Sequence, residues 1–196
     1  MDRYQIETSM SPSRHRLIEM LATRSARRGT FTLASGKLSS FYIDARLTTM
    51  SPEGLSAIGP VGLSMLRERG WDADSVGGLT LGADPVSYAI SYASASDSRP
   101  IRAFTVRKEA KGHGTGKLIE GPFAASDRVV VIEDVITTGG SALRAIETLQ
   151  NAGARILGVL AVVDREEGGR EAIEATGIPV ASIARVSEIL ERLPPL

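Results

Sequence analysis

Residues 129–141 read Val-Val-Val-Ile-Glu-Asp-Val-Ile-Thr-Thr-Gly-Gly-Ser, and this stretch decides the fold class. Its first four residues are all apolar, which predicts a fully buried strand. After the turn, Leu143, Ile146 and Leu149 recur at a spacing of three, which predicts a helix. A buried strand, a glycine turn and a helix in this order are typical of a parallel sheet covered by helices.

Two carboxylates, Glu133 and Asp134, directly follow the predicted strand. Because unpaired buried charge is costly, they indicate a ligand at this strand end. The turn that opens the helix leaves backbone N–H groups for a phosphate, which the helix dipole also attracts. The two acids suit vicinal hydroxyls or a cation, and the turn suits a phosphate. A ribose 5-phosphate carries both hydroxyls and a phosphate, so it fits the acids and the turn together. The alternative is an ordinary strand and turn with acids at its rim; the spacing matches neither a Walker loop nor a dinucleotide fingerprint.

The rest of the chain alternates between helical and strand patterns. The expected helices are 12–28, 52–69, 85–93, 141–151 and 170–175, with a short terminal helix. The expected strands are 30–33, 40–44, 76–79, 101–106, 129–132, 156–163 and 179–183. We therefore expect an α/β fold with a mainly parallel central sheet flanked by helices. A length of 196 residues fits a single domain, 1–196.

Composition excludes several classes of partner. The 23 basic and 23 acidic residues balance, so no overall charge favours nucleic acid or an anionic membrane. The N-terminus has no apolar stretch of the signal-peptide kind, and no segment approaches the roughly 20 apolar residues of a membrane span. The absence of cysteine excludes disulfides and thiolate metal sites and fits a cytoplasmic protein.

Five segments together resemble the orotate phosphoribosyltransferases, a family of type I phosphoribosyltransferases. Residues 131–141 look like the loop that binds phosphoribosyl pyrophosphate (PRPP) in that family. The other segments follow in the family's order: 31–37 with 41–44, 77–85, 106–114 and 164–166. The resemblance implies the type I fold with a small N-terminal hood, formed largely by residues 1–50 and the C-terminal segment. It also implies transfer of the 5-phosphoribosyl group from PRPP to orotate, giving orotidine 5′-monophosphate and pyrophosphate in pyrimidine (UMP) biosynthesis.

The resemblance also assigns roles to a cationic segment. Residues 107–117 combine basic residues and glycines without apolar periodicity, which predicts a mobile loop; the alternative is a solvated charged surface. The implied PRPP-binding residues are Arg107, Lys108, Lys111, His113, Glu133, Asp134, Val135, Ile136, Thr137, Thr138, Gly139, Gly140 and Ser141. Lys111, His113 and Asp134 are the implied catalytic residues. In the family the loop of one subunit enters the site of its partner, so the resemblance implies a homodimer with shared active sites.

Arg165 is expected near the same ligand. Parallel strands that begin at 129 and 156 end at one edge of the sheet, where ligands of open α/β sheets bind. A guanidinium suits a planar carboxylate, although a surface pair with Glu166 or Glu167 is the alternative. The resemblance assigns orotate binding to Thr137 and Arg165. Phe41 and Tyr42 are candidates to contact the orotate ring, although apolar residues on a short strand are more often core.

The chain departs from many relatives in the segment 77–85, which resembles their pyrophosphate loop. It has no lysine there, and none between Lys37 and Lys108. Backbone amides of residues 81–83 are then the expected donors. The resemblance implies Mg²⁺ held mainly through PRPP and water, near Asp84. A further departure is Ala34, where some relatives have a lysine.

Two other functions compete with orotate transfer. One is a purine-type phosphoribosyltransferase, against which the segment 35–36 and Arg165 argue. The other is a regulatory protein that only senses PRPP, for which a possible basic face comes from Arg14, Arg16, Arg24, Arg27 and Arg28. The segment before Phe31 is too short for a separate winged domain, so orotate transfer is the favoured reading.

Overall fold

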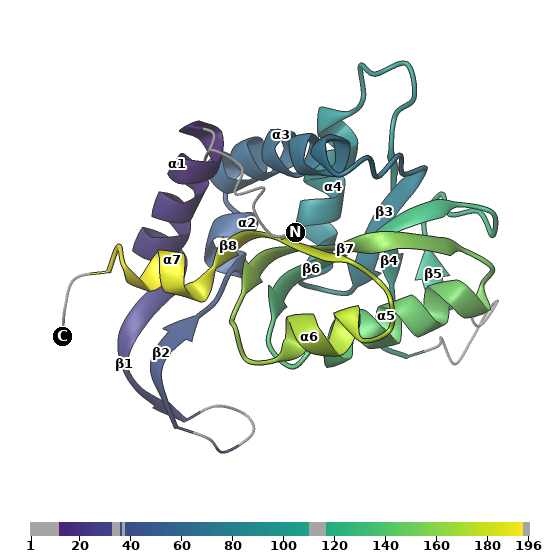
Figure 1. Cartoon of the computed structure of the whole chain (residues 1–196). Helices are drawn as coiled ribbons and strands as arrows, with labels where there is room; N and C mark the ends of the chain where they lie inside the picture. The colour runs from purple at the N-terminus through teal and green to yellow at the C-terminus, as the bar shows by residue number, and fades with distance from the viewer. Residues whose placement is uncertain (1–11, 33–35, 37, 110–116, 194–196) are drawn as a thin grey trace, which may run out of the picture.

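The computed structural model describes residues 12–32, 36, 38–109 and 117–193 (Figure 1). Its centre is a six-stranded sheet in the order β5-β4-β3-β6-β7-β8, with neighbours parallel except for β5 on β4. The strands are β3 (Ser75–Leu79), β4 (Arg102–Val106), β5 (Ile119–Glu120), β6 (Arg128–Ile136), β7 (Arg155–Asp164) and β8 (Val180–Arg185). The expected α/β fold is confirmed, and of these six strands only the short antiparallel β5 was not predicted.

Helices cover both faces of this sheet. Helices α3 (Pro52–Glu68) and α4 (Ala83–Ala93) lie on one face, and α5 (Gly140–Asn151) and α6 (Gly169–Glu174) lie on the other (Figure 1). Alternate residues of β6 serve the two cores, because successive side chains of a strand point to opposite faces. Val130 and Ile132 join one apolar cluster, whereas Val129 and Val131 join the other. A strand buried on both faces explains the unbroken apolar run.

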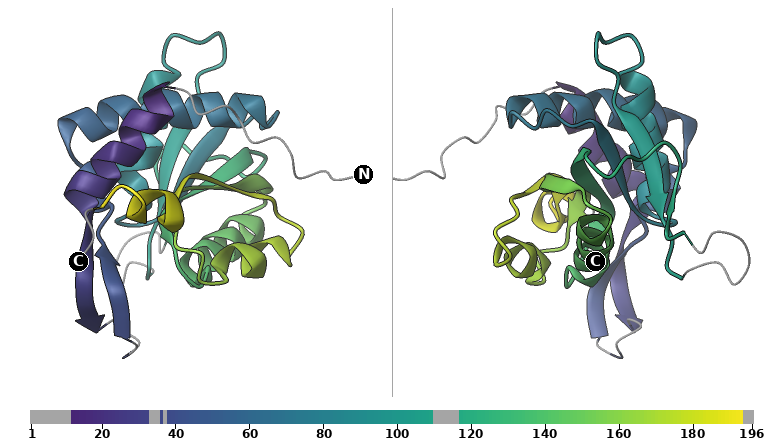
Figure 2. Two further views of the ribbon diagram at one scale, coloured as in Figure 1. Left: turned by 60° about the vertical axis from the view of Figure 1, so that its left-hand side comes forward. Right: turned by 90° about the vertical axis from the view of Figure 1, so that its right-hand side faces the viewer.

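The predicted helix 12–28 is too long. Helix α1 (Pro12–Met20) continues as one π-helical turn, η1 (Leu21–Ser25), and the chain then becomes extended in β1 (Ala26–Thr32). Strand β1 pairs antiparallel with β2 (Leu38–Ile43), from Ala26 opposite Ile43 to Thr32 opposite Leu38. This two-stranded ribbon projects from the main body (Figures 1 and 2). Pairing with β2 outweighs the local helical preference of residues 26–28. The boundaries of helices and strands are the least predictable part of a fold for this reason.

The N-terminal and C-terminal segments lie against each other. Arg14 of α1 donates to the carbonyl oxygen of Ile183 and pairs with Glu188 of α7 (Val186–Leu190) at 2.9 Å. Arg28 of β1 donates to the carbonyl oxygen of Leu190. We propose that these segments form the predicted hood, of which residues 1–11, 33–35, 37 and 194–196 lie outside the described part of the chain.

Strand β6 is longer than predicted, because it includes the two acids instead of ending before them. Its pairing with β7 continues through Glu133 opposite Ala161 to Ile136 opposite Asp164. On its other side, β3 pairs with β6 only as far as Gly77 opposite Val131. The acids therefore occupy a part of β6 that is paired with β7 but no longer with β3.

Within the described residues, no helix combines the length and the apolar character that a membrane span requires.

Candidate functional site

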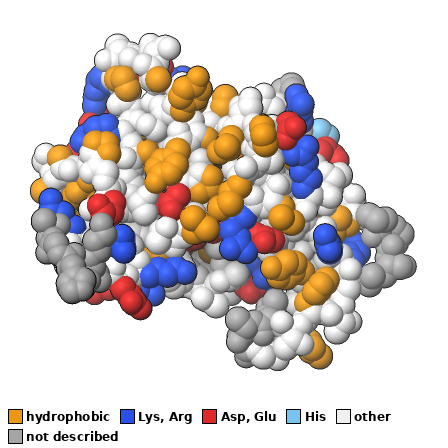
Figure 3. Space-filling view, turned by 180° about the vertical axis from the view of Figure 1, so that it is seen from behind, with side chains coloured by type: hydrophobic (Ala, Val, Ile, Leu, Met, Phe, Trp, Pro, Cys, Tyr) orange, Lys and Arg blue, Asp and Glu red, His pale blue; other side chains and the backbone are white. Residues whose placement is uncertain are grey.

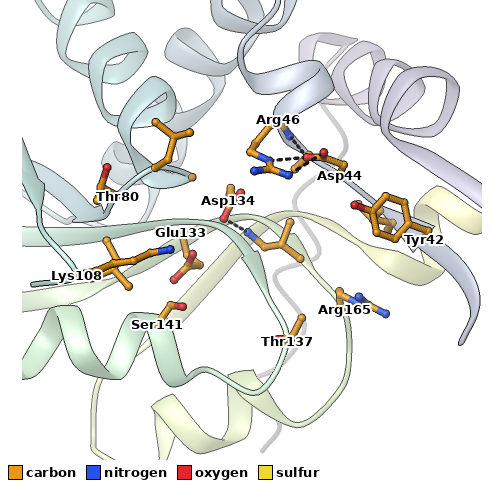
Figure 4. A pocket seen from close by; sticks show the side chains of 16 residues that line it. Tyr42, Asp44, Arg46, Thr80, Lys108, Glu133, Asp134, Thr137, Ser141 and Arg165 are labelled. Atoms are coloured by element: carbon orange, nitrogen blue, oxygen red, sulfur yellow. Dashed lines mark hydrogen bonds and ion pairs between the residues drawn. The ribbon is translucent and has the colours of Figure 1, made fainter. Parts of the chain in front are cut away.

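Two adjoining cavities lie at the carboxyl edge of the sheet. The larger is about 320 Å³, and its wall includes Asp44, Arg46, Asp134 and Arg165. The smaller is about 270 Å³ and lies over the start of α5. Residues Glu133, Val135, Thr137 and Ser141 line both cavities. Figure 4 shows Thr137 and Ser141 on one side of the acids, with Asp44 and Arg46 on the other. The prediction that Glu133, Asp134 and Arg165 emerge at one edge of the sheet is confirmed, because all three line the larger cavity.

The turn 137–141 has the properties of a phosphate site. Gly139 has φ of 82°, and the start of α5 has no side-chain cap, so its first N–H groups are free of side-chain partners. A Cβ on Gly139 would lie 2.8 Å from the carbonyl oxygen of Gly169, so the turn needs glycine for both conformation and space. The 12-residue helix places its positive dipole end at the smaller cavity.

Glu133 is buried between the two cavities. Only 6% of the residue is exposed, and its Oε2 has no hydrogen-bond partner among the described residues. Burial, and next the charge of Asp134, raise the pKa of Glu133 to about 9. In the ligand-free site this carboxyl therefore keeps its proton at neutral pH. A hydroxyl-bearing ligand would supply the hydrogen-bond partner that the protein does not.

Glu133→Gln is expected to stabilise the ligand-free protein in a pH-dependent way. Folding raises the pKa of this carboxyl from 4.5 to about 9, so its contribution to stability is greatest below pH 4.5 and is lost as pH rises towards 9. Glutamine does not titrate. Thermal unfolding should show a gain in Tm of roughly several degrees at pH 8 that is much smaller at pH 5. The exposed Glu147→Gln is the matched control. A gain equal at both pH values would contradict this assignment.

Asp134 lies against the turn that follows β3. Its Oδ1 accepts the N–H of Val135 at 2.9 Å. A Cβ on Gly82 would collide with the Asp134 carboxylate, so a glycine at position 82 is what allows this close approach. Thr80, Leu81 and Gly82 line the larger cavity, and the peptide between Thr80 and Leu81 is cis. The turn that resembles a pyrophosphate loop therefore faces the acids of β6.

Asp84 has a different environment from the one expected. It lies in the first turn of α4, it is buried, and it does not line the larger cavity. Its two oxygens accept hydrogen bonds from the hydroxyls of Thr80 at 2.7 Å and Thr105 at 2.8 Å. These contacts fix the turn 80–82 against β4. The Asp84 carboxylate is therefore occupied by these hydroxyls, whereas the Asp134 carboxylate lines the larger cavity.

Arg165 lies at the end of β7, where its N–H donates to the carbonyl oxygen of Ile136. Its guanidinium is 4.9 Å from the centre of the Phe41 ring, and only 7% of the residue is exposed. Nη2 is 2.7 Å from Oε1 of Glu167, yet neither Nε nor Nη2 has a hydrogen bond of suitable geometry among the described residues. The predicted contact with Glu167 exists. It leaves the buried donors available to a carboxylate in the cavity.

The two aromatic candidates are separated by the structure. Tyr42 lines the larger cavity and packs on Phe31 with ring centres 5.6 Å apart. Phe41 packs against the core and under Arg165. Phe41 is therefore placed to orient Arg165, and Tyr42 is placed to contact a ligand ring.

Only the base of the cationic segment is described. The N–H of Arg107 donates to the carbonyl oxygen of Leu118, and its guanidinium lies 3.7 Å from Glu120. Lys108 lines the larger cavity of its own chain, and Arg144 donates to its carbonyl oxygen. Lys111 and His113 lie outside the described residues, as does Ala34.

Sequence reasoning missed the contribution of the short helix α2 (Arg46–Thr49). Asp44 and Arg46, which line the larger cavity, form an ion pair of 2.8 Å. Hydrogen bonding to Arg46 lowers the pKa of Asp44. An acid as the last residue of the predicted strand 40–44 was the available signal, because acids at a strand end also identified Glu133 and Asp134. Nothing local showed that β2 ends beside β6.

The chain is similar to proteins of one known family. Residues 101–182 match the family model of the phosphoribosyl transferase domain. The orotate phosphoribosyltransferase of Aquifex aeolicus is 49% identical over 89% of this chain and 94% of its own length. That of Mycobacterium avium is 45% identical over 91% of this chain and 97% of its own.

Solved structures are similar as well. Orotate phosphoribosyltransferase of Mycobacterium tuberculosis in complex with PRPP has a TM-score of 0.77 and 40% identity, covering 91% of this chain and 99% of its own. The same enzyme with Fe(III) dicitrate has a TM-score of 0.80, 42% identity and the same coverage. Adenine phosphoribosyltransferase of Leishmania donovani, at 17% identity and a TM-score of 0.64, shares the fold.

Proposed function

This chain belongs to the orotate phosphoribosyltransferase family, and on that premise we propose that it transfers the 5-phosphoribosyl group of PRPP to orotate, giving orotidine 5′-monophosphate and pyrophosphate in pyrimidine (UMP) biosynthesis. The observation that carries the proposal is a pair of adjoining cavities that bring together a buried guanidinium, two acids and a phosphate turn. Arg165 and Asp134 line the larger cavity, residues 137–141 line the smaller one, and Glu133 lines both. A ribose phosphate joined to a carboxylated base has groups that complement each of these.

The reaction requires no nucleophile from the protein. N1 of orotate forms a bond to C1 of the ribose as the bond from C1 to the pyrophosphate oxygen breaks. The pyrophosphate leaves with the electron pair, and the N1 proton is released to it or to water. Positive charge grows on the ribose ring and negative charge on the leaving group. The protein therefore needs a fixed anion near the ribose and cations near the pyrophosphate.

We assign these tasks to the residues of the two cavities. The turn 137–141 holds the 5-phosphate, Glu133 accepts or donates at the ribose hydroxyls, and Asp134 offsets the positive charge of the ring. Lys108 contacts the pyrophosphate from its own chain, and Lys111 and His113 are proposed to complete its binding together with Arg107. Arg165 and Thr137 hold orotate, with Tyr42 against the ring and Phe41 behind Arg165.

Mg²⁺ is part of the proposal. Among the described residues, no group of three or more His, Cys, Asp or Glu could hold a metal ion, so the chain builds no cage of its own there. Magnesium is usually bound by one or two carboxylates together with substrate phosphates, and Asp134 beside the cavity fits that pattern. When bound, the ion supplies positive charge at the pyrophosphate.

A spectrophotometric assay tests the function. Absorbance of orotate should fall when the protein, PRPP and Mg²⁺ are mixed, and adenine or hypoxanthine should not replace orotate. Consumption of a purine base instead would support the purine-type reading. PRPP binding without loss of any base would support a PRPP sensor.

We propose that the chain acts as a homodimer with shared active sites. Large hydrophobic side chains are exposed at Leu47, Met50, Leu81, Tyr88 and Tyr92, the last 85% exposed, and Figure 3 shows hydrophobic side chains gathered on the face opposite that of Figure 1. Tyr88 donates to or accepts from Thr105 of β4, the strand that leads into the cationic segment. Such a surface next to that segment suits a second copy of the chain. Mixing two inactive variants, Lys111→Ala and Asp134→Asn, tests this. Activity returns in mixed dimers if each site is shared between two chains, and does not return if each chain has its own complete site.

The balanced charge and the absence of cysteine support two further parts of the proposal, a cytoplasmic location and no nucleic-acid or membrane partner.

A further inference from the structure

Arg46 is held in a fixed direction at the entrance of α2. Asp44 accepts from its Nε at 2.8 Å, from its Nη2 at 3.0 Å and from its backbone N–H at 3.1 Å. Buried contacts hold helix α2 in place. Thr48 and Thr49 are fully buried, and the hydroxyl of Ser25 forms a hydrogen bond with the hydroxyl of Thr48. A two-point contact of this kind restricts the planar guanidinium more than a single contact would.

This ion pair lies on the wall of the larger cavity. The Arg46 side chain is 49% exposed, and an ordinary exposed pair contributes little to stability. Its position indicates a role in ligand binding instead. Arg46 lines the same cavity as the turn 80–82, and Gly82 of that turn packs against Asp134. The guanidinium points towards Asp134 in Figure 4. Hydrogen bonding to Asp44 raises the pKa of Arg46, and the charge of Asp134 adds a smaller contribution in the same direction.

Arg46 has donors to spare. A guanidinium carries five N–H groups, of which Asp44 occupies two, and no other side chain of the described residues is seen to accept from it. The remaining donors suit a phosphoryl group, which accepts from a planar fork.

The turn 80–82 lacks a cation of its own. The sequence has no lysine between Lys37 and Lys108, so a ligand anion at this turn needs its positive charge from elsewhere. Three basic residues line the cavity: Arg46, Lys108 and Arg165. Arg165 stacks on Phe41 and is assigned to orotate, which leaves Arg46 as the guanidinium for an anion at the turn.

We propose that Arg46 binds the pyrophosphate of PRPP opposite the turn 80–82 and neutralises charge on the leaving group. This rests on the proposed function, in which the 5-phosphate occupies the turn 137–141 and the ribose lies along Glu133 and Asp134. The pyrophosphate, on the other side of the ribose, then meets Arg46 and the turn 80–82. Arg46 is a catalytic residue in this arrangement, and Asp44 positions it.

Three ligands measured by calorimetry with Mg²⁺ present test the proposal: PRPP, inorganic pyrophosphate and ribose 5-phosphate. In Arg46→Gln, the affinities for PRPP and for pyrophosphate should each fall by about tenfold or more, whereas the affinity for ribose 5-phosphate should not change. The KM for orotate should also stay the same. Arg67→Gln, which breaks an exposed ion pair with Asp97 away from this cavity, is the matched control and should change none of these values.

Removal of Arg46 also leaves Asp44 unpaired, and its charge alone would repel an anion. The double variant Asp44→Asn with Arg46→Gln removes that repulsion and should still bind pyrophosphate about tenfold more weakly than the unmodified protein. Recovery of full affinity in the double variant overturns the proposal. Unchanged affinities in Arg46→Gln, or an equal loss for ribose 5-phosphate, overturn it as well. If the unmodified protein consumes no orotate, the proposed function fails, and the pyrophosphate comparison still decides the role of Arg46.

Discussion

Asp134→Asn is expected to lower kcat/KM for orotate transfer by about 100-fold or more while the protein stays folded. The carboxylate lines the larger cavity, where the ribose is proposed to lie. Positive charge on the ring grows only in the transition state, so a fixed anion there lowers the barrier; removing a preorganised electrostatic partner typically costs about 100- to 1,000-fold in rate. Steady-state kinetics on the orotate absorbance, with unfolding curves for both proteins, measure the effect.

Asp97→Asn is the matched control, since Asp97 is a carboxylate paired with Arg67 and does not line either site cavity. Its kcat/KM should stay within about twofold of the unmodified value, because surface pairs contribute little. A loss of less than about threefold in Asp134→Asn would remove this carboxylate from the mechanism.

The same variant tests the shared active site. Lys111→Ala alone should lower kcat by about tenfold or more if the lysine acts on the leaving group. Mixed in equal amounts with exchange of chains, Lys111→Ala and Asp134→Asn form heterodimers with one site that has both residues. Random exchange then restores about a quarter of the unmodified activity, because half of the dimers are mixed and each has one intact site. No recovery after confirmed exchange means that each chain uses its own loop.

Arg165→Met should raise the KM for orotate by roughly 100-fold and leave the affinity for PRPP unchanged. The guanidinium is buried, it stacks on Phe41, and two of its nitrogens have no hydrogen bond among the described residues. A carboxylate that binds there is removed from water, so the loss of its charged partner costs about 2–5 kcal/mol. Methionine keeps the apolar stem against Phe41, which limits the change to the charge and its donors.

Arg155→Met on the same strand serves as its control. Arg155 begins β7 at the opposite edge of the sheet and is exposed, so its loss should change neither KM. Equal loss of orotate and PRPP affinity in Arg165→Met would indicate a distorted cavity rather than a lost orotate contact. Unchanged orotate KM would assign the base to another part of the cavity.

Strong local patterns predicted much of the fold. The apolar run 129–132 predicted a buried strand because no polar residue interrupts it, and the structure buries its side chains in two cores. The predicted end of this strand was wrong. The apolar pattern ends before Glu133, whereas pairing with β7 extends the strand to Ile136. The helix predicted over 12–28 failed for the same reason, because Ala26 and its successors pair with β2. Long-range hydrogen bonds decide such boundaries, and local preference does not reveal them.

By itself, the sequence determined the parallel α/β sheet, the turn 137–141 and the acids beside it, because alternating apolar periods and a glycine turn are local properties. Only the tertiary structure decided which other groups face that turn. Asp44 and Arg46 reach the cavity because a separate two-stranded ribbon ends beside β6, and Phe41 lies under Arg165 rather than in the cavity wall. Burial likewise set the raised pKa of Glu133. Distance and desolvation depend on segments far apart in the chain, so they arise only when those segments pack together.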